Sequence, residues 1–375
     1  MQEGDHLKRK VCLIFSLLAL LIGFEPASAA TIGEVLNRSH IFTHCSLAVL
    51  GRQALITVYS PGDESSRRKQ AVAAARLLVN NAPAQFTTIF VRYYDNAGAV
   101  SYCEVIVNTR DITSLSVGTA RLDDILSQLS VIYAQSGESA AQIFDKYLGA
   151  AEKQMDLGNF WEAEQIVDAA SATHGTPADT NTSSRFTRDM LNLADSFDCW
   201  GDPDRAERIL RRLLEHRSSV GNLADLDGDR SVQHLFDLLM ANKRYQDAET
   251  FLQTMLGNPS LAADCQPALY AANLERMALC HGRMGRNEQS AGEFAQAISI
   301  LQSHGGEYSS RLARCLEEMA DSLASQGKSA DARASLLRAR SIYDHAIVGR
   351  SPAERIDYQL YSAHVKQIEE KLKRL

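Results

Sequence analysis

The sequence predicts a mainly α-helical protein, in which a helical solenoid of tandem helix pairs follows a small α+β domain of β-α-β-β order. Three observations support this prediction. Segments with the composition of β-strands occur within about residues 31–130. After about residue 139 a turn motif recurs every 42 or 43 residues, and leucine and alanine recur at helical spacing. With 375 residues, 45% hydrophobic and 23% charged, the composition suits a globular domain plus an array and excludes a disordered or collagen-like chain.

Residues 1–29 are interpreted as a signal peptide. The basic residues Lys8–Lys10 precede an apolar run, Val11–Phe24, that is shorter than the roughly 20 residues needed to cross a bilayer. The small residues Ala27–Ala29 supply a cleavage site. We therefore expect an exported protein, periplasmic or secreted, with no integral membrane span after cleavage. The acidic residues Glu3 and Asp5 are unusual in such a segment, so a later start or an uncleaved N-terminal anchor is the alternative.

Residues 30–135 are predicted to form the small α+β domain. The run Ala54–Ser60 is rich in β-forming residues and stops at Pro61, which indicates a strand. A helix is expected over about 65–80, because its alanine and leucine residues fall on one face.

A β-hairpin should follow that helix. Two β-rich runs, 86–94 and 100–109, are separated by the turn sequence Asp95–Gly98. In the second run Cys103, Val105 and Val107 alternate with Tyr102, Glu104 and Ile106. A short helix around 121–133 is expected to connect this domain to the rest of the chain.

Residues 139–350 are predicted to form five helix-pair repeats. A turn residue followed five positions later by a tiny residue recurs at 158, 201, 243, 285 and 327, with spacings of 43, 42, 42 and 42. A glycine reverses the chain, and small residues allow two helix axes to approach. The residues assigned this structural role are Gly158, Ala163, Gly201, Ala206, Ala248, Gly285, Gly327 and Ala332.

This layout resembles the tetratricopeptide repeat, and the 42-residue period with long inter-repeat loops is most similar to the variant found in kinesin light chains. The resemblance covers about residues 139–345 and implies that the first helix of each pair lines a concave groove. Lys243 and Ser290 depart from two signature positions, and the aromatic residue often found in the first helix occurs only as Phe197. Residues 351–375 are predicted to form a charged capping helix that starts at Ser351 and shields the open end of the solenoid.

Charged residues recur on the predicted groove face, and acids outnumber bases there. We hypothesise that this acidic groove binds a partner-protein segment that carries lysine or arginine. In the alternative interpretation, rows of opposite charge only stabilise neighbouring helices. The predicted groove residues are the acidic Glu152, Asp195, Asp237 and Asp321, six positions before a turn residue, and the basic Arg188, Arg230 and Arg314, thirteen positions before one.

The predicted function is therefore a non-enzymatic scaffold or adaptor for protein–protein interaction, with no cofactor. A net charge of -7 disfavours nucleic acid and anionic membranes as main partners. The main rival is an N-terminal domain that binds a small ligand or is catalytic and is positioned by the repeats. Self-association into a structural assembly is a third possibility.

Metal sites and disulfides are weakly indicated. His40, His44 and Cys45 lack a further partner at zinc-binding spacing, and Asp225–Asp229 lacks the flanking carboxylates of a calcium loop, so no metal site is predicted. Six cysteines remain after signal cleavage, an even number that permits disulfides, but their scatter shows no framework spacing.

Overall fold

The computed structural model describes residues 26–43, 45–82, 85–176, 180–304, 310–347 and 355–375. It divides into two compact units, one ending at Asp189 and the other beginning at Met190. Most of the predicted signal segment lies outside the described residues, and helix α2 (Pro26–Arg38) begins before the predicted cleavage site. None of the helices in the described ranges combines the length and apolar character needed to span a membrane.

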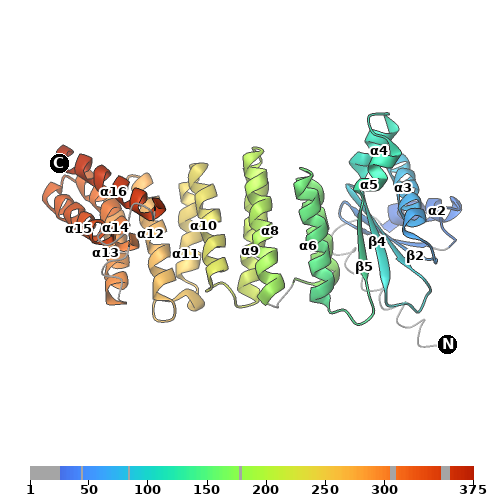
Figure 1. The fold of residues 1–375 in the computed structure, drawn as a ribbon, viewed down its shortest axis with the longest axis horizontal. Coiled ribbons are helices and arrows are strands. Elements are labelled where there is room, and N and C mark those ends of the chain that lie inside the picture. Colours follow the sequence, from blue (N-terminus) through green and yellow to red (C-terminus); the bar gives the residue numbers. More distant parts are fainter. Residues whose placement is uncertain (1–25, 44, 83–84, 177–179, 305–309, 348–354) are drawn as a thin grey trace. The chain divides into compact units, whose positions relative to one another are not determined.

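The first unit contains a five-stranded sheet within its described residues (Figure 1). Strands β2 and β3 are parallel and are connected by helix α3 (Glu64–Asn81), whereas all other neighbouring strands are antiparallel. The strands lie in sequence order: β1 (Cys45–Leu50), β2 (Gln53–Tyr59), β3 (Thr88–Tyr94), β4 (Tyr102–Asn108) and β5 (Ser130–Ala134).

The structure confirms the predicted strand, helix and hairpin as β2, α3 and β3–β4, but the predicted β-α-β-β order is incomplete. The predicted order omits strands β1 and β5 and helix α4 (Thr109–Ser116), all of which the structure contains. The helix expected over 121–133 is wrong in its second half, since α5 (Leu122–Gln128) ends and the chain then pairs with β4. The β-branched and aromatic residues of β5 favour this pairing, and Ile132 is buried by it.

The two faces of the sheet have different chemistry. On one face, α3 packs its alanines and Leu78 against apolar strand residues such as Ile56, Val91 and Val105, forming the core of the unit. On the other face Arg92, Tyr102 and Glu104 contact the first helix pair. The residues predicted to alternate along β4 therefore lie on opposite faces of the sheet, with Cys103, Val105 and Val107 toward the apolar core and Tyr102 and Glu104 toward the first helix pair.

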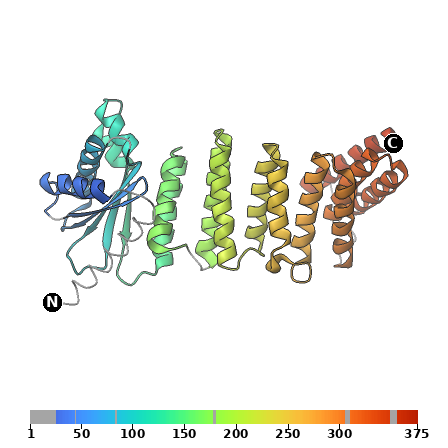
Figure 2. The same cartoon turned by 180° about the vertical axis from the view of Figure 1, so that it is seen from behind.

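Tandem helix pairs follow the sheet, as predicted (Figures 1 and 2). Consecutive helices pack against each other within the pairs α6–α7, α12–α13 and α14–α15. The pairs are α6 (Ala140–Asp156) with α7 (Phe160–His174), α8 (Thr180–Cys199) with α9 (Pro203–Ser219), α10 (Leu226–Ala241) with α11 (Tyr245–Leu256), α12 (Pro267–Arg283) with α13 (Asn287–Ser303), and α14 (Ser310–Ser325) with α15 (Ser329–Ile347).

The turns between paired helices share one backbone geometry. The residues at 158, 201, 243, 285 and 327 all have positive φ, between 58° and 83°. The amide after each of them donates to a carbonyl five residues earlier, as in Asn159 N–H to Gln154 O at 2.8 Å, which is the Schellman arrangement that ends a helix. Lys243 adopts this conformation with φ 58° although it is not glycine.

The tiny residues five positions later are all buried. The alanines at 163, 206, 248 and 332 are at most 1% exposed, and so is Ser290. The Ser290 hydroxyl lies 2.8 Å from that of Ser322 on the next first helix, so its polar group is satisfied. Both departures from the repeat signature therefore preserve the fold of the pair.

Helix α16 (Arg355–Arg374) packs against α15 as the predicted capping helix. Its Ile368 is fully buried, and His364 stacks on Tyr343 with ring centroids 4.9 Å apart. The predicted cap residue Ser351 lies outside the described residues.

Candidate partner-binding surface

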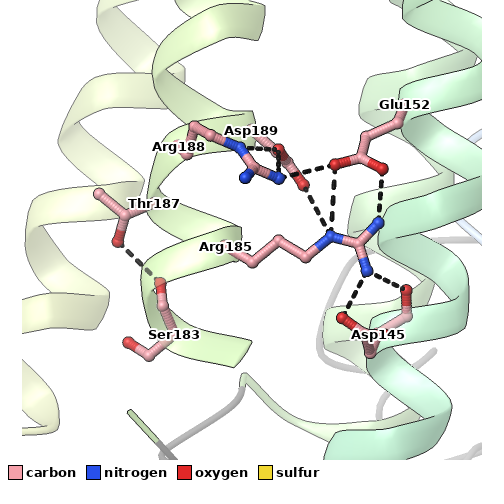
Figure 3. Close-up of polar contacts among 7 residues, drawn as sticks. All are labelled: Asp145, Glu152, Ser183, Arg185, Thr187, Arg188 and Asp189. Atoms are coloured by element: carbon pink, nitrogen blue, oxygen red, sulfur yellow. Dashed lines mark hydrogen bonds and ion pairs between the residues drawn. The ribbon is translucent and has the colours of Figure 1, made fainter. Parts of the chain in front are cut away.

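Charged side chains connect the first helices of successive repeats, and we call this set of contacts the inter-repeat ladder. In the first unit, Glu152 on α6 accepts hydrogen bonds from Arg185 at 2.5 Å and Arg188 at 2.8 Å on α8 (Figure 3). Arg185 also donates to Asp145 at 2.5 Å, and Arg188 reaches Asp189. The predicted groove residues Glu152 and Arg188 thus bind each other.

Local interactions shift the pKa values of the partly exposed Glu152 and the buried Asp189 in opposite directions. Hydrogen bonding from Arg185 lowers the pKa of Glu152 below its ordinary value. Burial, together with the negative charge of Glu152, raises the pKa of Asp189 to about 6. Glu152 is therefore a permanently ionised partner for the arginines, whereas Asp189 changes its charge near neutral pH.

The second unit contains further contacts of the inter-repeat ladder, and in each of them the base and the acid come from the same relative helices. A basic side chain on the later helix contacts an acid on the preceding first helix, and the arginine and lysine contacts join repeats by charge-assisted hydrogen bonds. The contacts are His234 to Asp195 at 3.1 Å, Arg276 to Asp229 at 2.7 Å, Arg311 to Glu275 at 3.0 Å, Arg314 to Glu275 at 2.5 Å, His364 to Glu317 at 3.1 Å and Lys371 to Asp321 at 2.8 Å.

These contacts show where the remaining predicted groove residues lie. Asp195 and Asp321 are each contacted by a basic side chain of the following helix, His234 and Lys371, and Asp237 accepts a hydrogen bond from Gln233 at 2.7 Å. Arg314 pairs with Glu275, and Arg230 approaches Asp227 of its own helix at 4.0 Å. The alternative interpretation, that charges of opposite sign stabilise neighbouring helices, describes most of these residues.

The second unit contains an open hollow of about 400 Å³ on the first-helix face. We call it the arginine hollow, because four arginines from three successive first helices line it. Two histidines, two tyrosines and Leu360 complete much of its wall. The named lining residues are Arg230, Arg276, Arg311, Arg314, His234, His364, Tyr343, Tyr361 and Leu360.

Within the arginine hollow, the acids are buried more deeply than the bases that bind them. The side chain of Glu275 is 4% exposed, whereas Arg314, which binds it, is 53% exposed. The side chain of Glu317 is likewise more buried than its partners His364 and Lys371. Elsewhere on the first-helix face, Asp195 and Asp321 are 60% and 52% exposed, so the bases are not the more exposed partners in every pair of the ladder.

Sequence reasoning missed Arg276, Arg311, Tyr343, Tyr361 and His364. The first two lie outside the rows counted from the turn residues, although Arg311 is one helical turn before Arg314. The other three belong to α15 and α16, where the sequence was interpreted only as packing and a solvated end. These three residues could have been predicted from the capping helix, because a helix that follows the fifth pair takes the position of a further first helix and therefore faces the same surface.

The face of the sheet opposite α3 holds a second polar cluster. Glu104 accepts hydrogen bonds from Arg92 at 2.7 Å and from the Tyr147 hydroxyl at 2.5 Å. The Tyr102 hydroxyl lies 3.1 Å from His174, whose pKa is lowered by burial. Glu104 and Tyr147 are each 1% exposed, so this cluster joins the sheet to the first helix pair and is closed to a substrate.

The segment Asp225–Asp229 begins α10. The Asp225 carboxylate accepts from the Gly228 amide at 2.8 Å and caps the helix, and it also binds Arg217. A Cβ at Gly228 would lie 2.2 Å from the Leu223 carbonyl oxygen, so this tight turn requires glycine. Among the residues described, no three His, Cys, Asp or Glu side chains form a group that could hold a metal ion; His44 lies outside them.

The tandem helix pairs, their shared turn geometry and the buried tiny residues define a tetratricopeptide-like helical repeat protein preceded by a small sheet domain. No protein-family profile and no curated protein sequence matches the chain.

Solved structures of helical-repeat proteins are similar over much of the chain. BtubC from P. vanneervenii is 15% identical, with 77% of this chain and 92% of that chain covered and a TM-score of 0.42. The TPR-like repeats of a kinesin light chain of Podosopora anserina are 16% identical, with 57% and 100% covered and a TM-score of 0.38. The apo form of RapI is 12% identical, with 62% and 83% covered and a TM-score of 0.41.

Proposed function

We propose that the protein is a scaffold that binds a segment of a partner protein on the first-helix face of its second unit. The observation that supports this proposal is the arginine hollow, which combines exposed charged side chains with an aromatic wall and is lined by residues of five helices. Interfaces between proteins are rich in arginine and tyrosine, which provide large contact area and hydrogen bonds together.

The geometry favours binding over catalysis. The close polar contacts of this face are ion pairs and hydrogen bonds that hold one helix to the next. The rival interpretation, a catalytic or ligand-binding N-terminal domain, gains little from the Glu104 cluster, because the Glu104 carboxylate is 1% exposed and accepts a hydrogen bond from Tyr147 of α6.

Site-specific photo-crosslinking tests the location of the binding surface. A photoreactive amino acid replaces Arg230, which is exposed on α10, or Leu337, which is exposed on the second helix α15. We expect a partner to be captured from position 230 and not from position 337. Equal capture from both positions, or capture from 337 alone, would contradict the proposal, and capture of a second copy of this chain would identify self-association.

We also propose that the protein is exported, on the grounds of the basic and apolar residues 8–24 and the small residues that follow. Mass spectrometry of the protein isolated from its native cells tests this. A mature N-terminus at Ala30 in the exported fraction supports cleavage, and an intact N-terminus in the membrane fraction supports the anchor instead.

A further inference from the structure

The charges around the arginine hollow do not cancel. The lining of the hollow contains four guanidinium groups, from Arg230, Arg276, Arg311 and Arg314, and one carboxylate, from Asp229. From outside the lining, Asp227 pairs with Arg230 and Glu275 pairs with Arg311 and Arg314. Glu275 is shared by two arginines, so that group of three side chains carries one excess positive charge. Asp195 and Asp237 lie on α8 and α10, where His234 and Gln233 contact them.

The exposed charge in the hollow is therefore positive toward α14. The side chains of Arg230 and Arg314 are 59% and 53% exposed, whereas Asp227, Asp229 and Glu275 are all less than half as exposed. A ligand that enters the hollow meets guanidinium groups first. Because guanidinium groups bind carboxylates in a planar, two-pronged geometry, carboxylate side chains are the matching partners.

The wall formed by α15 and α16 adds an apolar contribution. Leu360 is 52% exposed, and the partly exposed Tyr361 packs on the buried Tyr343 with ring centroids 5.7 Å apart. An apolar side chain of the ligand can cover this surface while neighbouring carboxylates contact the arginines. The volume of about 400 Å³ accommodates a few side chains rather than a folded domain.

We propose that the arginine hollow binds a short acidic segment of another protein, in which an apolar side chain is flanked by carboxylates. This inference rests on the proposed function and specifies its partner, replacing the basic segment expected from sequence. A protein segment is favoured over nucleic acid because the chain has a net charge of -7 and the hollow accommodates only a few side chains.

Fluorescence anisotropy with defined probes tests the proposal on the full chain. The probe is a fluorescein-labelled nonapeptide with blocked ends, in which four glutamates flank one leucine. The comparison probes are the same peptide with glutamine or lysine in place of glutamate, and a labelled ten-nucleotide thymidine strand. We expect only the glutamate peptide to bind measurably, with an affinity that falls as salt rises.

Substitutions locate the binding. R314Q leaves Arg311 to pair with Glu275, so the helix contact survives, and it is expected to weaken binding about tenfold, the effect of one exposed charge-assisted contact. R230Q should weaken peptide binding to a similar extent. Y361A should also weaken peptide binding, but the dependence of the affinity on salt should stay unchanged because no charge is removed. The matched control is R333Q on the exposed surface of α15, which is expected to leave the affinity unchanged. Circular dichroism checks that each variant folds.

Each other outcome overturns the inference. Tighter binding of the lysine peptide restores the acidic interpretation, equal binding of the thymidine strand shows a general polyanion surface, and absence of peptide binding removes the acidic segment as ligand. An equal loss with R333Q places the contact elsewhere. Photo-crosslinking from position 230 does not depend on the charge of the partner, so its result separates failure of this inference from failure of the proposed function.

Discussion

At the scale of single residues, the repeat tolerates departures from its signature when the backbone geometry is kept. Lys243 occupies a left-handed conformation, φ 58°, that the equivalent glycines adopt without steric cost. K243G is therefore expected to stabilise the protein by about 1 kcal/mol, because a non-glycine residue pays roughly that amount in this region. Urea denaturation measures the change, and G285A, at an equivalent turn, should have the opposite sign. A lower stability for K243G would show that its side chain contributes more than the strain costs.

A second residue-scale prediction concerns pH. The pKa of buried Asp189 is raised to about 6 in the folded protein, above its ordinary unfolded value. The folded state therefore holds this proton more tightly, so its stabilising contribution is complete below about pH 4 and is lost as pH rises through 6. Relative to D189N, the wild type should lose on the order of 2 kcal/mol of unfolding free energy between pH 4 and pH 7.

Parallel urea titrations of wild type and D189N at both pH values measure this difference. The conservative variant keeps the shape of the side chain and removes its titration. A constant difference between the two proteins across this pH range would show that Asp189 is ionised throughout and is compensated by Arg188 and Arg185.

At the scale of elements, α16 takes the place of a sixth first helix. It covers Tyr343 and buries Ile368, and its Lys371 supplies the last cation of the inter-repeat ladder, which contacts Glu317 and Asp321. A chain ending at residue 347 is expected to lose at least about 2 kcal/mol of stability and to self-associate, because an apolar helix surface becomes exposed. Light scattering after size exclusion and thermal unfolding measure both effects. K371Q, which keeps the helix, should have the same oligomeric state as the wild type. A truncated chain with unchanged oligomeric state and unchanged melting would contradict the capping role.

The elements also show what the sequence could predict. The helix pairs were predictable because glycine turns and tiny residues repeat at a fixed period. Each repeat needs them at the same positions, since the same two helices must reverse direction and pack closely. Strand β5 was not predictable from the sequence. It has only five residues, Ser130–Ala134, directly after a helix, which is too short a segment for a clear periodicity, and these residues form a strand because they pair with β4. The charge of the hollow was not predictable for a different reason: Glu275 and Arg314 differ in depth, which sequence spacing does not encode.

At the scale of the whole molecule, the helix pairs are divided between two compact units. The Glu104 cluster joins the sheet to α6 and α7 in the first unit, and the Glu275 cluster joins α12 to α14 in the second. Because cooperative unfolding follows contiguous contacts, each cluster should stabilise mainly its own unit. E104Q leaves the Arg92 charge buried without its carboxylate and is expected to cost about 3 kcal/mol. E275Q should cost less, about 1–2 kcal/mol, because its arginines are partly exposed to solvent.

Segment-resolved hydrogen exchange distinguishes the two units in the intact protein. E104Q should lower protection in β4 and α6 and leave α12 and α14 unchanged, whereas E275Q should show the reverse pattern. The matched control is E288Q in the first turn of α13, an exposed carboxylate that is expected to leave protection unchanged in both units. If either variant lowers protection equally along the whole chain, the repeats unfold as one cooperative array, and a segment bound in the arginine hollow would then stabilise the sheet domain as well as the helices that contact it.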